Sequence, residues 1–583
     1  MSEDREHQKL ESLIRKYTIL NAYTHRGKAH AQAVLSKVLG EMPQYKKKAL
    51  EVLSEVKRAV EEVNRLTLQE QKKILEETWP ELLEAKPKVE ERALPPLPEA
   101  DKYPQVVTRF SPNPDCVLHM GSARAIILSW SYARMYHGVF LLRFEDTDPH
   151  LKKPSLEFYD SIREDLLWLG CKWDREYIQS QRLGLYYIYA KKLLEEGKAY
   201  VCTCQPEVFR RKISARQPCP CREQPPETHL HRWEKMLDGG FGEGEAVVRV
   251  KTDLSHPNPA VRDWPALRIV DTGKTPHPLV GDRYRVWPLY NFSSGLDDHL
   301  LGVTHVIRGK EHLTNEQRQR YLYHHLGWDY PTAIHYGRLK IEGVLLSKSK
   351  IKLGVEQGVY EGYSDPRLAT FAALRRRGIK PQAIEEMILE IGLKPVDITL
   401  SWDTLYSHNR RILDPVANRY FFVAQPFLLE VSGAEKPFKA VHPLHPEHPE
   451  RGFRAFEIKP DKGVIRLLVS GNDRPLFTSG AYLRLKNLFN IQVKAFQEGK
   501  ALASFTGTSH EEAQKGHVPI IHYLPAASNI PSLMVMPDGS RIEGFSEEAC
   551  KGLKVGEMVQ LERWGFARVD AVAPQLTFFY AHK

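Results

Sequence analysis

Residues 106–148 read VVTRFSPNPDCVLHMGSARAIILSWSYARMYHGVFLLRFEDTD, and this stretch decides the fold. A short apolar run over residues 105–110 predicts a strand, and HMGS at residues 119–122 opens a segment with the apolar spacing of a helix. We expect Gly138 to end that helix in a left-handed cap, ahead of a second buried strand over residues 139–144. Strand, loop, helix and strand in this order predict a parallel βαβ unit, which binds ligands at the loop after its first strand.

The loop that opens this helix has the composition of a phosphate-binding site. Gly121 lets a ligand approach the backbone closely, and the first turn of a helix offers free N–H groups to phosphate. His119 is placed to hydrogen-bond a phosphate oxygen beside them. A loop histidine and a turn glycine without any function would give the same letters, so HMGS alone does not establish a nucleotide site.

Length, charge and cysteine content limit the class of protein. A chain of 583 residues is too long for one hydrophobic core, so several domains are expected. The net charge of +10 and the pI of about 9.0 favour an anionic partner, and RNA is preferred to a membrane because no long apolar run exists. A basic enzyme that binds no RNA would have the same charge balance. The N-terminus lacks the core of a signal peptide and the cysteines do not form a secreted framework, so we expect a cytoplasmic protein.

The order of patterns along the chain predicts a multidomain protein. Leu10, Ile14 and similar apolar positions at helical spacing indicate an N-terminal helical domain over residues 1–85. Short alternating runs such as VIRLLV and LTFFYAH, separated by turn residues, indicate C-terminal all-β barrels. The remaining expected segments are a proline-rich linker (86–100), the two halves of an α/β, Rossmann-like parallel-sheet catalytic domain (101–199 and 286–355), an insertion between them (200–285), a helical subdomain (356–402) and the barrels (403–583).

After the insertion we expect the parallel sheet to resume. The runs at residues 284–291 and 303–308 are short and apolar, as buried strands are, and we assign both to the parallel sheet.

Two cysteine pairs in the insertion predict a metal site. Cys202 and Cys204 are separated by one residue, as are Cys219 and Cys221, and fourteen residues lie between the pairs. Zinc prefers four such ligands in a tetrahedron, and two close pairs joined by a loop supply them. Free buried thiols and disulfides are the alternatives, and a reducing compartment favours the metal. Four thiolates leave no open position, so the expected Zn²⁺ is structural.

Residues 345–349 read LLSKS and form a second motif, which is interpreted together with HMGS. Together the two segments resemble the "HIGH" and "KMSKS" signatures of class I aminoacyl-tRNA synthetases. The flanking segments RFSPNP, LLRFEDTDP, GVTHVIRGKEH and DPRLATFAALRRRG are similar to those of archaeal and eukaryotic glutamyl-tRNA synthetases, which are related to the glutaminyl-tRNA synthetases. The resemblance runs from about Tyr103 to the C-terminus. Ser122 stands in place of the second His, and Leu345-Leu346 in place of Lys-Met, so the phosphate roles of those positions do not carry over.

The resemblance implies ATP-dependent attachment of glutamate to tRNA through glutamyl-adenylate, with Mg²⁺ accompanying the ATP. It implies that the catalytic residues are His119, Gly121, Ser347, Lys348 and Ser349, and that ATP also meets Arg338 and Leu339. It implies an amino-acid pocket made of Arg109, Ser111, Glu145, Tyr290, Ser294 and Arg308.

Within this pocket Glu145 is expected to take the substrate ammonium and Arg109 a substrate carboxylate. A salt bridge of Arg109 with Glu145 or Asp146 is the alternative. Arg308 decides between glutamate and glutamine, because glutaminyl enzymes of the family carry a small neutral residue at this position. The alternative for Arg308 is a purely stabilising pair with Glu311.

The family also implies partners and roles for the other segments. The insertion would hold the tRNA acceptor end, the helical subdomain the tRNA stem, and the barrels the anticodon. We expect a monomer that takes L-glutamate and the glutamate tRNA, with the glutamine tRNA as a second candidate and no membrane partner. A glutaminyl-tRNA synthetase and an inactive tRNA-binding synthetase-like protein remain as alternatives, the second because of Ser122 and Leu345.

Overall fold

The computed structural model describes residues 2–24, 27–82, 94–343 and 346–583. The chain forms two compact units, residues 1–93 and 94–583, and each is described by itself. The first unit consists of α1 (Ser2–Thr24), α2 (Ala31–Glu41), α3 (Ala49–Val63) and α4 (Leu68–Thr78). Its buried side chains include Leu10, Ile14, Val38 and Val56, so the predicted helical N-terminus is confirmed. Residues 83–85 of the predicted helical domain and 86–93 of the predicted linker lie outside the described residues.

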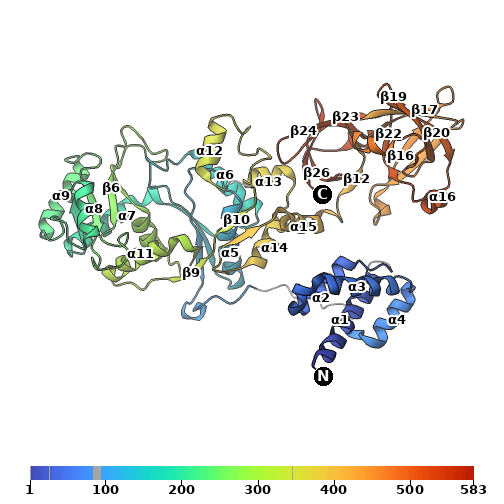
Figure 1. Ribbon diagram of the computed structural model, residues 1–583. Helices are drawn as coiled ribbons and strands as arrows, with labels where there is room; N and C mark the ends of the chain where they lie inside the picture. The colour runs from blue at the N-terminus through green and yellow to red at the C-terminus, as the bar shows by residue number, and fades with distance from the viewer. Residues whose placement is uncertain (1, 25–26, 83–93, 344–345) are drawn as a thin grey trace. The chain divides into compact units, whose positions relative to one another are not determined.

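A parallel sheet forms the centre of residues 94–583 (Figure 1). Strand β1 (Val107–Phe110) pairs with β2 (Val139–Phe144), and β2 pairs with β3 (Arg175–Ile178). The crossovers are α5 (Met120–Met135) and α6 (Leu156–Trp168). The predicted parallel βαβ unit is therefore confirmed.

A second parallel pair of strands forms its own two-stranded sheet and lies beside β1. Strand β8 (His305–Gly309) runs parallel to β9 (Thr332–Tyr336). The Thr304 N–H donates to Val107 O at 3.0 Å, which places β8 beside β1. The strand order is β3-β2-β1-β8-β9, so the winding reverses between β1 and β8. Open α/β sheets bind ligands at such a reversal, and the HMGS loop follows β1 at this point.

The end of α5 differs from the expected glycine cap. His137, not Gly138, takes the left-handed conformation, with φ of 49°. The Gly138 N–H donates to Ala133 O at 2.7 Å and the His137 N–H to Arg134 O at 3.1 Å, so the carbonyls of the last turn are satisfied. Gly138 is needed for a different reason, because a Cβ there would lie 2.1 Å from Val106 O.

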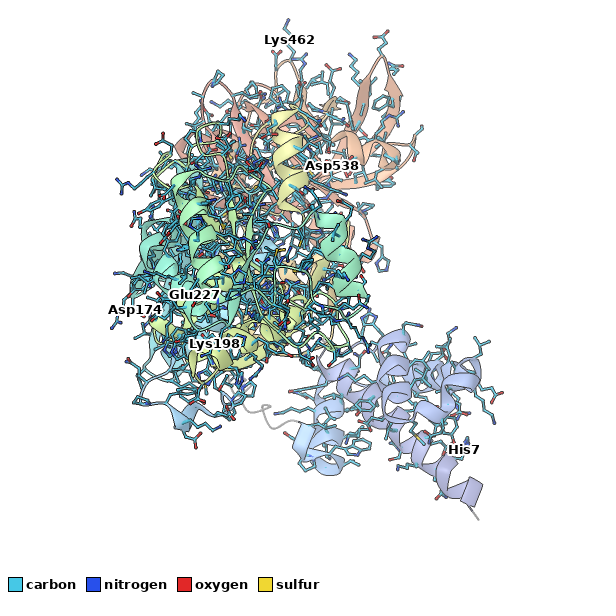
Figure 2. The ribbon with its side chains drawn as sticks, turned by 90° about the vertical axis from the view of Figure 1, so that its left-hand side faces the viewer. His7, Asp174, Lys198, Glu227, Lys462 and Asp538 are labelled. Carbon is cyan, nitrogen blue, oxygen red and sulfur yellow. The ribbon has the colours of Figure 1, made fainter. Side chains whose placement is uncertain are left out.

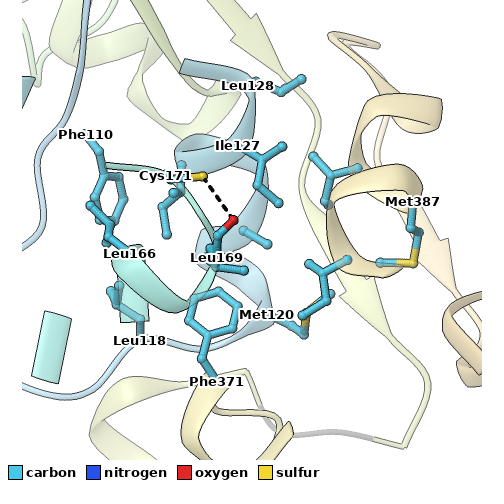
Figure 3. Close-up of a cluster of buried hydrophobic side chains, with 14 of the residues drawn as sticks. Phe110, Leu118, Met120, Ile127, Leu128, Leu166, Leu169, Cys171, Phe371 and Met387 are labelled. Atoms are coloured by element: carbon cyan, nitrogen blue, oxygen red, sulfur yellow. Dashed lines mark hydrogen bonds between the residues drawn. The ribbon is translucent and has the colours of Figure 1, made fainter. Parts of the chain in front are cut away.

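The core behind the sheet joins segments that are far apart in sequence (Figure 3). Ile127 of α5 packs near Leu166 of α6, Phe371 and Met387, all of them buried. Phe371 begins α13 (Phe371–Arg377) and Met387 lies in α14 (Pro381–Ile391). The helix behind the HMGS loop therefore depends on residues some 250 positions later for its packing.

The insertion has its own antiparallel sheet, in the order β4-β5-β6-β7. Its elements are β4 (Ala199–Cys202), α8 (Pro206–Ser214), α9 (Pro226–Asp238), β5 (Val247–Val250), β6 (Pro265–Ile269) and β7 (Val286–Pro288), preceded by α7 (Leu183–Glu195). The prediction that the parallel sheet resumes at residues 284–291 is wrong. A three-residue apolar run does not identify its partner strand, and β7 pairs with β6, Ile269 opposite Val286.

The segments between the insertion and the barrels belong to the catalytic core. They are α10 (Tyr290–Leu300), α11 (Leu313–Leu326), β10 (Leu339–Ile341), α12 (Lys348–Glu356), α13, α14, β11 (Ile398–Leu400) and α15 (Trp402–Leu413). Strand β10, which precedes the LLSKS loop, runs parallel to β11. The expected barrel region, residues 403–583, opens with most of α15, and its strands begin at Asn418.

Two seven-stranded sheets form the C-terminal region as nearly closed barrels, which confirms the all-β prediction (Figure 1). The first contains β14 (Phe427–Ser432), β17 (Val464–Val469), β18 (Tyr482–Leu485), β19 (Asn490–Gln497), β20 (Lys500–Gly507), β21 (Ile520–Ile521) and β22 (Tyr523–Pro525). The second contains β12 (Asn418–Tyr420), β13 (Phe422–Ala424), β23 (Ile530–Val535), β24 (Arg541–Ser546), β25 (Met558–Leu561), β26 (Gly565–Ala571) and β27 (Leu576–His582). A hairpin of β15 (Phe438–Pro443) and β16 (Phe453–Ile458) accompanies them. Charged side chains such as Lys462 and Asp538 are exposed on this region (Figure 2).

Candidate active site

The HMGS loop has a fixed geometry around His119. His119 is the N-cap of α5, and its Nδ1 accepts a hydrogen bond from the Gly121 N–H at 3.0 Å. A Cβ on residue 121 would lie 2.7 Å from His119 Cε1, so any residue other than glycine would push the ring aside. Because Nδ1 is an acceptor, the neutral ring carries its proton on Nε2. Nε2 has no hydrogen-bond partner among the described residues, so it is available as a donor.

The protonation state of His119 follows from its surroundings. Burial, and then the positive charge of Lys348, lower the pKa of His119 to about 4. The imidazole is therefore neutral near pH 7 and donates through Nε2 without carrying a charge of its own. The site's positive charge comes from Lys348, and the dipole of α5 adds a partial positive charge at its N-terminus.

The same loop is held from its other side by residues that precede α13. His119 and Thr370 form an antiparallel bridge. The Met120 N–H donates to Ala369 O at 2.9 Å, and the Phe371 N–H donates to Leu118 O at 3.3 Å. The loop is thus paired as in a short sheet, which fixes the orientation of the first turn of α5.

The SKS residues lie against the loop that joins β1 to α5. Lys348 Nζ donates to Asn113 O at 3.1 Å and lies 3.3 Å from Asp115 Oδ1. The Ser347 and Ser349 hydroxyls are 3.3 Å apart, with Ser347 as the N-cap of α12. Leu345, which departs from the family motif, lies outside the described residues.

A cavity of about 460 Å³ opens beside the HMGS loop. It brings together four residues expected to meet ATP, namely His119, Gly121, Arg338 and Leu339. Glu311, Tyr336, Lys340, Ile341 and Leu346 complete its lining, and Lys348 is not part of it. The volume is in the range of small-molecule sites.

The expected amino-acid residues form a buried ionic network. Arg109 pairs with Asp298, with 3.1 Å between Nε and Oδ1 and 3.4 Å between Nη2 and Oδ2, rather than with Glu145 or Asp146. Arg143 donates to Asp298 Oδ1 at 2.8 Å and to Glu145 Oε1 at 2.9 Å. Asp146 accepts instead from Tyr159, Ser180 and the Ser180 backbone.

Sequence reasoning missed Arg143 and Asp298, which hold this network together. Arg143 is fully buried in β2 and also donates to the Ser294 hydroxyl at 3.0 Å. A charged residue within the apolar run LLRF was the available signal. Asp298 lies in α10 and had no such signal, because its two arginine partners are 189 and 155 residues away in sequence.

Arg308 is held by neutral groups. It donates from Nη1 to Gln319 Oε1 at 3.1 Å, from Nη2 to the Tyr330 hydroxyl at 2.9 Å and from Nε to His335 Nε2 at 3.4 Å. It does not pair with Glu311, whose carboxylate faces Arg338 at 3.6 Å. Within the described residues, no carboxylate lies in ion-pair distance of Arg308, although its side chain is only 5% exposed.

Two further expected pocket residues complete the surroundings. Tyr290 shares a hydrogen bond with His312 Nδ1 at 3.2 Å, and burial, with the Glu145 carboxylate, raises the pKa of Tyr290. Burial and the Arg308 and Arg109 guanidiniums lower the pKa of His312 to about 4, so it is neutral. The Ser111 hydroxyl is buried and has no partner among the described residues.

The residues expected to form the amino-acid pocket therefore carry an excess positive charge. Arg109, Arg143 and Arg308 contribute three positive charges, and Glu145 and Asp298 contribute two negative ones. Burial opposes ionisation of Asp298, yet Arg109 and Arg143 outweigh it and lower its pKa. Burial raises the pKa of Glu145, which we count as ionised because it accepts from Arg143. The net charge of +1 matches glutamate, whose two carboxylates and one ammonium sum to −1.

The four insertion cysteines lie together. Cys202 and Cys219 have their Sγ atoms 3.9 Å apart, and those of Cys204 and Cys221 are 3.7 Å apart. Disulfide sulfurs would be about 2.05 Å apart, and all four cysteines are free thiols. Four sulfurs about 2.3 Å from one zinc ion have tetrahedral edges of about 3.8 Å, which the two measured distances match. The sulfurs of Cys202, Cys204 and Cys221 all lie within 4.8 Å of one another, whereas Cys219 does not belong to that group. Burial raises the pKa of Cys204 to about 11, a cost that a bound cation would offset.

A phosphate loop at the reversal of a parallel sheet, faced by a lysine from an SKS loop, is the arrangement of class I aminoacyl-tRNA synthetases. The family model "tRNA synthetases class I (E and Q), catalytic domain" matches residues 105–415. The two models for the "anti-codon binding domain" of the same family match residues 417–506 and 520–570. The chain belongs to the class I (E and Q) tRNA synthetases.

Relatives named glutamate–tRNA ligase match nearly the whole chain. The Thermococcus kodakarensis protein is 52% identical over 582 residues, which cover 99% of this chain and 100% of the relative. The Pyrococcus abyssi protein is 52% identical over 98% of this chain and 100% of its own length. The Hyperthermus butylicus protein is 46% identical over 97% of this chain and 100% of its own length. None of the helices among the described residues has the length and apolar character needed to cross a bilayer.

Proposed function

We propose that this chain is a glutamate–tRNA ligase, which activates L-glutamate with ATP and transfers it to the glutamate tRNA. The observation that carries the choice of glutamate is Arg308, a buried guanidinium whose three hydrogen-bond partners are all neutral. Relatives with this name match the chain at about half of all positions, and neither alternative function is favoured.

In the first step the substrate carboxylate attacks the α-phosphate of ATP, and pyrophosphate leaves. His119 Nε2 would bind phosphate oxygens at the positive end of the α5 dipole, and Arg338 and Leu339 line the adjoining cavity. Lys348 would leave Asn113 and Asp115 and neutralise charge on the departing pyrophosphate as its loop closes, with the Ser347 and Ser349 hydroxyls beside it.

The class I reaction requires Mg²⁺ with the ATP. Among the described residues the only cluster of potential metal ligands consists of cysteines, so the phosphates themselves would hold this ion. The protein's part in catalysis is then to position the reactants and to stabilise the phosphate charge.

In the amino-acid pocket Glu145 would take the substrate ammonium, and Arg308 would take the side-chain carboxylate. The charge of Arg109 is largely committed to Asp298, so Arg109 would contribute a directed N–H rather than a free charge. The hydroxyls of Ser111, Tyr290 and Ser294 are placed to complete the contacts.

We test this proposal with Arg308→Cys. The variant should lose roughly a thousandfold in kcat/KM for glutamate, because an unpaired buried charge costs several kcal/mol and the carboxylate would lose its partner. Rejection of glutamine should weaken. The assay is charging of total tRNA with labelled glutamate and, separately, labelled glutamine. Wild-type preference for glutamine would contradict the proposal, and wild-type rates in Arg308→Cys would make the arginine structural.

We further propose roles for the other segments. Residues 200–285 would hold the tRNA acceptor end, stiffened by one Zn²⁺ on Cys202, Cys204, Cys219 and Cys221. Residues 356–402 would contact the tRNA stem, and the barrels the anticodon, as the matched domain models are named. Single-stranded anticodon bases suit stacking and edge contacts on such barrels. We keep the expectation of a monomer, which sedimentation in solution would test.

A further inference from the structure

The three acceptors that hold Arg308 come from two elements and from the loop between them. Gln319 lies in α11, His335 lies in β9 and Tyr330 lies between those elements. The Tyr330 hydroxyl accepts a hydrogen bond from Arg308 and itself donates to Gln319 Oε1 at 2.7 Å. Arg308, Tyr330 and Gln319 thus form a closed ring of hydrogen bonds. Each acceptor is neutral, and the ring fixes the guanidinium without supplying a negative charge.

Gln319 is the informative member of this ring. Its Oε1 accepts from both Arg308 and Tyr330, which settles the orientation of the amide. The side chain is fully buried, and its Nε2 has no hydrogen-bond partner among the described residues. An unsatisfied buried N–H₂ is destabilising. A glutamate of the same shape would remove that donor and pair with Arg308, so fold stability alone does not account for an amide here.

His335 is held in the form that keeps it an acceptor. Because Arg308 donates to Nε2, the neutral ring carries its proton on Nδ1, which lies 3.4 Å from Glu316 Oε2. Burial and the Arg308 charge lower the pKa of His335, so the ring is neutral. The Glu316 carboxylate pairs with Arg320 at 2.7 Å, and it acts on Arg308 only from a longer distance, where it helps to raise the pKa of Arg308.

We propose that Gln319, with Tyr330 and His335, determines specificity for the side-chain carboxylate of the amino acid. These residues orient Arg308 and leave its guanidinium without a directly paired carboxylate until substrate binds, although the Asp298 and Glu316 charges act on it from farther away and raise its pKa. The inference rests on the proposed function and deepens it. It says that residues which need not touch the substrate determine whether the enzyme selects a charged or a neutral amino-acid side chain.

The test is Gln319→Glu, which changes the charge and keeps the shape. The KM for glutamate should rise by roughly ten- to a hundredfold, because the new carboxylate takes the charge of Arg308. The KM for glutamine should change much less, and the melting temperature should stay the same or rise. Gln317→Glu is the matched control, since the same substitution two residues away on α11 is exposed and should change neither constant.

A second variant, Tyr330→Phe, removes one acceptor without adding charge and should raise the KM for glutamate severalfold while leaving kcat close to wild type. The inference is overturned if wild type charges glutamate and Gln319→Glu, folded as judged by its melting curve, keeps the wild-type KM. If Gln319→Glu does not fold, an unchanged KM in Tyr330→Phe overturns it. Failure of wild type to charge glutamate would instead refute the proposed function.

Discussion

Replacing Gly121 with alanine puts a methyl group where the His119 ring now lies. The added Cβ would be 2.7 Å from His119 Cε1 and 2.9 Å from Nδ1, whereas carbon atoms in contact prefer about 3.5–4.0 Å. Gly121 does not have a positive φ, so backbone strain is not part of the effect. The ring is confined by burial and must move by roughly 1 Å to relieve the overlap.

Two costs follow from this movement. The Gly121 N–H loses its acceptor, and loss of an N-cap costs about 0.5–2 kcal/mol of stability. The Nε2 donor shifts away from the phosphate position, and a misplacement of about 1 Å in an active site lowers the rate by roughly a hundredfold. We therefore expect a modest loss of thermal stability and a large loss of adenylate formation.

ATP–pyrophosphate exchange, measured with tRNA present because the family usually needs it for activation, reports the first reaction step. Gly184→Ala in α7 is the matched control, because no atom lies within 4 Å of a Cβ at that position. It should leave exchange unchanged and stabilise the fold by about 0.4–1 kcal/mol. Exchange in Gly121→Ala within about twofold of wild type would refute the assigned role of the HMGS loop.

Three other perturbations test the site. Lys348→Ala should slow exchange by on the order of a hundredfold at nearly constant KM for glutamate. Lys350→Ala, which changes an exposed neighbour, should have no effect. Equal exchange rates in the two variants would mean that LLSKS is a surface loop without a catalytic role. Purified protein should contain about one zinc ion per chain and lose it in Cys202→Ser, and a folded zinc-free protein with four titratable thiols would contradict the metal site. Because the pKa of His119 is lowered from 6.5 to about 4, the stability that depends on its neutral ring is fully present above the ordinary pKa and is lost as the pH falls from about 6.5 to about 4. The exchange rate should then show no inflection from this group between about pH 6 and 8, and an inflection there that disappears in His119→Asn would show a normal pKa.

Local patterns predicted the elements whose partners are near in sequence. The βαβ unit over β1, α5 and β2 follows from apolar spacing and turn residues within about forty residues. The sheet to which β7 belongs was mispredicted, because the sequence of a short strand does not show which other strand it will hydrogen-bond to. The left-handed residue was predicted to be Gly138, because glycine adopts this conformation most easily, but it is His137. Residue 138 must be glycine because a side chain there would collide with the Val106 carbonyl.

The candidate site was predictable where one motif carries both position and chemistry. The family resemblance assigned His119, Gly121, Arg338 and Leu339 to ATP, and these four residues line one cavity. The partners of Arg109 and Arg308 were not predictable, since Asp298 and Gln319 are ordinary residues of amphipathic helices until the fold brings them to the arginines.

Arg124 in α5 has a consequence for how the chain is made. Its buried guanidinium donates to Gly337 O at 2.6 Å and to Gly392 O and Lys394 O at 2.7 and 2.9 Å, acceptors that follow it by 213 to 270 residues. At about 5–20 residues per second, a ribosome needs on the order of 10–50 s to synthesise that distance. Until those acceptors have been synthesised, the Arg124 guanidinium has no protein partners and must stay hydrated. The core around α5 therefore cannot pack while the chain is still short. Nascent chains that stop before Lys394 should accordingly remain protease-sensitive at α5 and should depend on chaperones.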